Sequence, residues 1–145
     1  MKNENDFEQR ITSLKCRAMQ DGNKRLIEGY ALLYNHRSKL LNEDNEFFYE
    51  EIKPGALSHL LFDPKLDVIA TPNHKYDQVI GRTLSGTLKL INDEKGLKYI
   101  VEVPDTSAGN DIYQSIKRGD VFESSFTFYV DSSGQKWSKE NGNNI

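Results

Sequence analysis

Hydrophobic and polar residues alternate along the first third of the chain. Residues 10–19 have the period of a half-buried strand, with one face made by Thr12, Leu14, Cys16 and Ala18. The Asp21-Gly22 pair that follows is typical of a tight turn, and the residues after it, up to position 34, favour strand structure. The pattern therefore predicts a β-hairpin over residues 10–34.

The middle of the chain is less regular. Residues 35–45 are polar and without periodicity, which predicts a long exposed loop. Residues 46–52 are typical of a short strand, and residues 56–62 have apolar positions at helical spacing. A brief apolar strand is then expected over residues 66–70.

The residue after that strand, Thr71, precedes a proline. Pro72 lacks an amide donor and restrains the residue before it, so regular structure should stop there. His74 is therefore expected in a loop or at the end of a strand. Further on, two strand-like segments over residues 86–91 and 97–103 flank a polar turn, in which Gly96 is suited to a left-handed conformation.

The last regular segments are a helix and a strand. Residues 105–119 have a helix-start signal at Asp105 or Thr106 and end at Gly119. Residues 121–130 alternate, and their aromatic face is expected in the core. That face consists of Phe122, Ser124, Phe126, Phe128 and Val130.

These six or seven strands and two helices predict an α+β, mainly β fold. We expect a small, mostly antiparallel β-barrel with two or more short flanking helices. A chain of 145 residues allows one domain, which we assign to residues 10–131. The polar ends, residues 1–9 and 132–145, are expected to be flexible or, at the C-terminus, disordered or cut short.

Composition excludes several classes of function. The 19 basic and 22 acidic residues give a formal charge of −3, which argues against a nucleic-acid partner. No apolar run approaches the roughly 20 residues that span a membrane, and the polar start is unlike a signal peptide. The lone Cys16 forms no intrachain disulfide, so a reducing, cytoplasmic setting is expected. Phosphate-binding, dinucleotide-binding and zinc motifs are absent, so we expect neither cofactor nor metal.

The remaining candidates for chemistry are histidine and serine. His36 and His59 are interpreted as surface residues, whereas His74 is expected at the rim of a sheet, where a general base could act. Ser124 and Ser125 are adjacent in a strand, so their hydroxyls point to opposite sides. Ser125 faces away from the aromatic core on a rigid element, as a nucleophile requires. The residues alone leave open that Ser125 is an ordinary exposed strand serine.

A resemblance to the prohead proteases of tailed phages covers nearly the whole chain. These are capsid-maturation serine peptidases related in fold to the herpesvirus assemblins. The matching segments are collinear, and five together are more specific than any single motif. They are IEGYALLYN, YEEIKPGAL, NHKYDQVIGRTLSGTLKL, EKGLKYIVEVPDTSAGNDIYQSIKRGD and VFESSFTFYV.

The resemblance implies catalytic roles for two residues. The histidine of the family's Asn-His segment falls on His74, and its nucleophilic serine falls on Ser125. An acidic residue that orients the histidine is expected in a strand beyond the end of this chain. Asp131 and Glu140 match no motif, and Glu123 only shares a face with Ser125, so no third residue is assigned.

The function that the resemblance implies is a serine endopeptidase of procapsid maturation. It would cleave scaffold and major capsid protein segments, and itself, in the host cytoplasm inside the procapsid, or be a prophage-encoded bacterial protein. A homodimer is compatible with the resemblance. The alternative is a non-catalytic capsid-assembly module that binds scaffold with the same fold. Because the chain stops early, we expect either a trimmed or autoprocessed form or a decayed gene, and weak or absent activity of the isolated chain.

Overall fold

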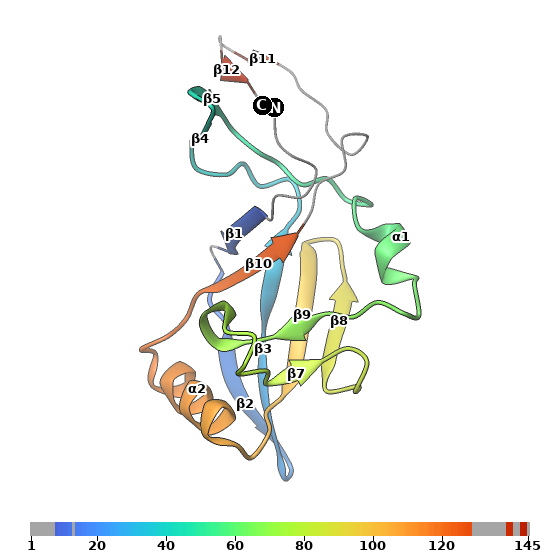
Figure 1. Cartoon of the computed structure of the whole chain (residues 1–145), viewed down its shortest axis with the longest axis vertical. Coiled ribbons are helices and arrows are strands. Elements are labelled where there is room, and N and C mark those ends of the chain that lie inside the picture. The colour runs from blue at the N-terminus through green and yellow to red at the C-terminus, as the bar shows by residue number, and fades with distance from the viewer. Residues whose placement is uncertain (1–7, 13, 129–138, 141–142, 145) are drawn as a thin grey trace.

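The computed structural model describes residues 8–12, 14–128, 139–140 and 143–144. The helices are α1 (Ser58–Leu61), the 3₁₀ turn η1 (Pro72–His74) and α2 (Ser107–Arg118). The strands are β1 (Glu8–Thr12), β2 (Arg17–Asp21), β3 (Lys24–Leu33), β4 (Leu41–Glu43), β5 (Glu46–Phe48), β6 (Ile69–Ala70), β7 (Gly81–Arg82), β8 (Leu88–Asn92), β9 (Gly96–Glu102), β10 (Ser124–Phe128), β11 (Lys139–Glu140) and β12 (Asn143–Asn144). Figure 1 shows their arrangement.

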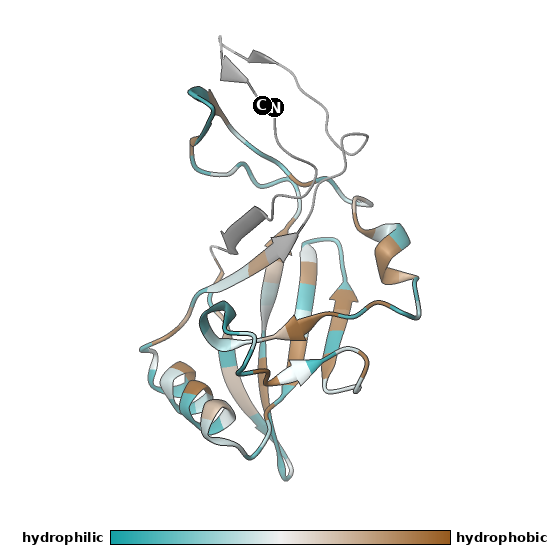
Figure 2. Ribbon diagram, viewed as in Figure 1, coloured by the Kyte–Doolittle hydropathy of each residue, from teal (hydrophilic) through white to brown (hydrophobic). Residues whose placement is uncertain are grey.

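The centre of the molecule is an antiparallel four-stranded sheet in the order β2-β3-β9-β8. Helix α2 packs beside β2, and the apolar positions of the sheet appear as brown bands in Figure 2. Burial of these apolar side chains removes them from water and drives the packing. The main core cluster consists of Cys16, Ile27, Ile80, Leu88, Val101, Val103, Tyr113 and Ile116.

Strand β10 belongs to a second, two-stranded sheet. It pairs with β1 in antiparallel register, so that Ser125 lies opposite Ile11. Both strands of this pair contact β3, and Figure 1 shows them crossing one end of it. Two further sheets, β11-β12-β5-β4 and the short pair β6-β7, complete the described strands.

The mainly β, α+β class is confirmed, but the predicted barrel is wrong. Among the described residues the strands form four separate sheets. The central sheet, β2-β3-β9-β8, does not close into a barrel. Alternation identifies the buried face of a strand, but not whether its edge meets another strand. Neither the predicted single domain nor its limits are tested, and most of residues 1–9 and 132–145 lie outside the described part of the chain.

Several predicted elements differ in detail. Residues 10–19 do not form one strand, because β1 ends at Thr12 and β2 begins at Arg17. The polar 35–45 segment contains the short strand β4. Phe122 was expected in the core but is 41% exposed. Gly96 is not left-handed; it opens β9, where the chain passes very close to β3.

Helix α2 follows its sequence signals closely. The side chain of Thr106 accepts a hydrogen bond from the backbone N–H of Gly109, at 3.1 Å, and so caps the first turn. Gly119 ends the helix in the left-handed region with a φ of 85°. After the helix, residues 120–123 lead to the start of β10.

Candidate active site

Ser125 lies on β10 with its side chain half-buried. The preceding residue, Ser124, is only 8% exposed, because successive side chains of a strand point to opposite faces. The predicted orientation of the two hydroxyls is therefore present. The side chain of Ser124 points into the protein, and the side chain of Ser125 lies on the opposite face of β10, where it is partly exposed.

His74 lies on the turn that follows β6. Pro72 opens the turn, and Asn73 and His74 both have left-handed backbone conformations, with φ angles of 51° and 55°. Such conformations are uncommon outside glycine and cost free energy, although asparagine and histidine tolerate them better than most residues. The turn places the imidazole beside β10.

The two candidate residues meet although 51 positions separate them in the chain. His74 Nε2 lies 2.5 Å from Ser125 Oγ. In the tautomer with its proton on Nδ1, the imidazole accepts the hydrogen bond that the serine hydroxyl donates through this contact. A nucleophile and a base in direct contact are the minimum arrangement for activating a serine.

The inner side of β10 has a separate polar contact. The hydroxyl of Tyr99, on β9, lies 2.5 Å from Ser124 Oγ, and the Cys16 thiol interacts with both groups. Burial raises the pKa of Tyr99 to about 12 and raises the pKa of the Cys16 thiol above its usual value. The Tyr99 hydroxyl and the Cys16 thiol are therefore neutral near pH 7.

The other histidines are not part of this arrangement. His36 is exposed, and its Nδ1 lies 2.8 Å from the backbone oxygen of Tyr34. His59 is exposed on α1. Of the acids considered as a third catalytic group, Glu123 is exposed, whereas Asp131 and the side chain of Glu140 lie outside the described part of the chain.

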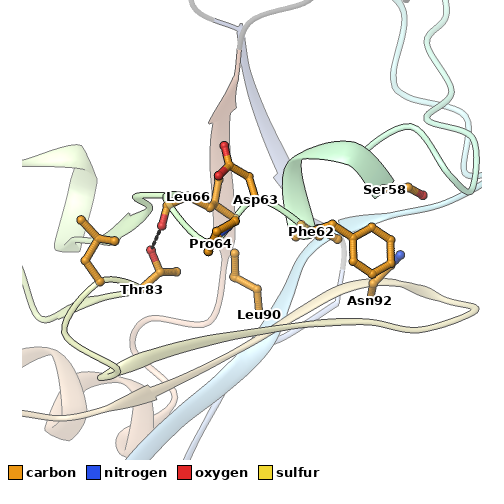
Figure 3. Close-up of a pocket in the computed structure, with 10 residues that line it drawn as sticks. Ser58, Phe62, Asp63, Pro64, Leu66, Thr83, Leu90 and Asn92 are labelled. Carbon is orange, nitrogen blue, oxygen red and sulfur yellow. Dashed lines mark hydrogen bonds between the residues drawn. The ribbon is translucent and has the colours of Figure 1, made fainter.

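A pocket of about 470 Å³ lies elsewhere, between α1, the segment after it and β8 (Figure 3). Across it, Thr83 Oγ1 donates a hydrogen bond to the Leu66 carbonyl at 2.8 Å. Neither His74 nor Ser125 lines this pocket. The contact between imidazole and hydroxyl is a stronger indication of chemistry than the pocket, because an imidazole beside a hydroxyl is an arrangement that can activate a serine.

The described residues include no group of three histidine, cysteine or acidic side chains arranged to hold a metal ion. None of the described helices has the length and apolar character needed to cross a membrane.

Two residues of the site region were not singled out from the sequence. Tyr99 lies within the predicted 97–103 strand and shares one face of it with Leu97, Val101 and Val103, with nothing in the pattern to distinguish it. A glycine in the interior of a strand pattern is a known signal of close approach, and Gly29 carries that signal.

Comparison with known protein families gives a match. Residues 12–145 match the family model described as caudovirus prohead serine protease. No curated protein and no solved structure matches the chain.

Proposed function

The chain belongs to the caudovirus prohead serine protease family, and we propose that it is a serine endopeptidase with Ser125 as nucleophile and His74 as general base. The observation that carries this assignment is the 2.5 Å contact between His74 Nε2 and Ser125 Oγ. The half-buried position of Ser125 on a strand supports it, because a nucleophile must be accessible and yet held in place.

The proposed reaction is acyl transfer in two steps. His74 Nε2 takes the Ser125 proton while Oγ attacks the peptide carbonyl carbon and the carbonyl electrons move to oxygen. The carbonyl re-forms, the C–N bond breaks, and the leaving amine takes the proton from His74. Water then attacks the ester carbonyl carbon while His74 Nε2 takes its proton. The bond from that carbon to Ser125 Oγ breaks, Oγ takes the proton back from His74, and the acid is released.

The family is one of phage capsid maturation, so capsid protein segments are its substrates in general. For this chain we propose scaffold and major capsid protein segments as substrates, together with cleavage of the chain itself. The reaction would take place inside the procapsid in the host cytoplasm. A homodimer remains part of the proposal.

The test is cleavage of the capsid or scaffold polypeptide encoded with this protein, followed by gel electrophoresis and mass spectrometry. We expect discrete fragments with the wild-type chain, formed slowly because its activity is expected to be weak, and none with Ser125→Ala. Ser85→Ala is the matched control, because Ser85 is an exposed loop serine and should retain full cleavage.

Equal cleavage by wild type and Ser125→Ala would overturn the proposed nucleophile. Tight binding of the scaffold without any processing, unchanged in His74→Ala and Ser125→Ala, would instead favour a non-catalytic assembly module.

A further inference from the structure

The hydroxyl of Tyr99 reaches the residue next to the proposed nucleophile from the interior. Ser124 Oγ lies 2.5 Å from Tyr99 Oη, while Ser125 Oγ lies 2.5 Å from His74 Nε2. The two consecutive serines of β10 are thus held from opposite faces. Their Cα atoms are about 3.8 Å apart, so a displacement of one moves the other.

Gly29 makes the Tyr99 contact sterically feasible. It is paired with Tyr99 in the register of β3 and β9 and is buried. A Cβ atom at position 29 would lie 2.8 Å from the Tyr99 hydroxyl oxygen and 3.0 Å from the Cβ of Cys16. The missing side chain leaves the space that the tyrosine hydroxyl occupies beside β3.

The contact between Tyr99 and Ser124 matters because β10 does not pair with a strand of the central sheet. The backbone of β10 pairs with β1, whereas Tyr99 belongs to the central sheet. A backbone hydrogen bond from Cys16 N to the Phe122 carbonyl, at 3.0 Å, joins the segment before β10 to the residue that precedes β2. The bond from Tyr99 to Ser124 extends that attachment to the residue beside Ser125.

We propose that Tyr99 is a positioning residue, whose hydroxyl holds Ser124 and thereby sets the Ser125 hydroxyl against His74. This inference rests on the proposed function. Tyr99 acts through Ser124 and does not touch the reacting atoms. Since its pKa is about 12, the hydroxyl keeps its proton, and the hydrogen bond persists across the neutral pH range.

The test compares Tyr99→Phe with Tyr113→Phe in the full chain. Tyr113 is a matched control, because it is 4% exposed in the same core and its hydroxyl donates to the Met19 carbonyl at 3.2 Å, away from β10. Each variant loses one tyrosine hydroxyl and its part-buried hydrogen bond, and Tyr99→Phe also loses the contact with the Cys16 thiol. Only Tyr99→Phe should lower kcat, by about tenfold to a hundredfold, with KM unchanged, because a small misplacement of a reacting group has effects of that size.

Ser124→Ala provides a second, independent variant. If Tyr99 acts through Ser124, Ser124→Ala should lower kcat to a similar extent, and the double variant Tyr99→Phe/Ser124→Ala should be no worse than the more impaired single variant. Melting temperatures of all four variants report stability separately. Should Tyr99→Phe fold poorly, Ser124→Ala alone still tests the contact.

The inference is overturned if Tyr99→Phe and Ser124→Ala keep the kcat of Tyr113→Phe, or if their effects on kcat are additive. In that case cleavage that still depends on Ser125 leaves the proposed function standing. Cleavage by the wild-type chain that does not depend on Ser125 would defeat the proposed function itself, and this inference with it.

Discussion

Replacement of Ser125 or His74 by alanine should lower kcat by at least about a thousandfold on a peptide that spans a capsid cleavage site. Without Ser125 Oγ there is no atom to form the acyl-enzyme. Without His74 Nε2, which lies 2.5 Å from that oxygen, nothing in this contact removes the hydroxyl proton. Steady-state kinetics at saturating peptide measures the loss, and KM should change little because neither group is proposed to bind the substrate.

The double variant His74→Ala/Ser125→Ala should be no less active than Ser125→Ala alone, because two residues that act as one unit do not give additive losses. His59→Ala is the control, since His59 is exposed on α1 and should retain full activity. A His74→Ala variant with near wild-type kcat would show that another group activates the serine.

The Gly96→Ala substitution should destabilise the fold by about 3 kcal/mol, which is at the upper end for overpacking. An added Cβ would lie 2.0 Å from the Leu32 carbonyl oxygen and 2.9 Å from the Leu33 Cα. Both are backbone atoms of β3, the strand that pairs with β9, so neither can move aside as a flexible side chain would. Chemical denaturation, with the free energy of unfolding extrapolated to water, measures the effect.

Glu94→Ala is the matched control for that substitution. Glu94 is an exposed residue in the same turn, and its replacement should change the free energy of unfolding by no more than about 0.5 kcal/mol. A Gly96→Ala variant as stable as Glu94→Ala would contradict the close approach of β9 to β3.

The fold could be predicted where local rules decide the structure. The β2-β3 and β8-β9 hairpins and helix α2 follow turn residues, alternation and capping that neighbouring positions show directly. That the sheet stays open could not be predicted, because pairing between distant strands leaves no local signal. Gly96 illustrates the same limit. A turn glycine suggests a left-handed backbone, but here the requirement is the proximity of β3.

The candidate site was predictable to a similar degree. The alternation of side chains along a strand is enough to predict that Ser124 and Ser125 point to opposite faces of β10. The choice of His74 as the partner depended on the family resemblance, since no periodic pattern relates residues 51 positions apart. Tyr99 could not be recognised from the sequence, because its proposed role depends on its hydroxyl lying beside Gly29 of β3 and Ser124 of β10, which are far apart in the chain.

The most direct test of the central claim is covalent labelling with a fluorophosphonate, followed by mass spectrometric mapping of the modified residue. This reagent forms a bond with a serine oxygen that is activated by a base. We expect a single adduct on Ser125, formed at a rate that falls sharply in His74→Ala. An adduct on a different residue, or labelling of Ser125 at the same rate without the imidazole of His74, would contradict the assignment of these two residues as nucleophile and base.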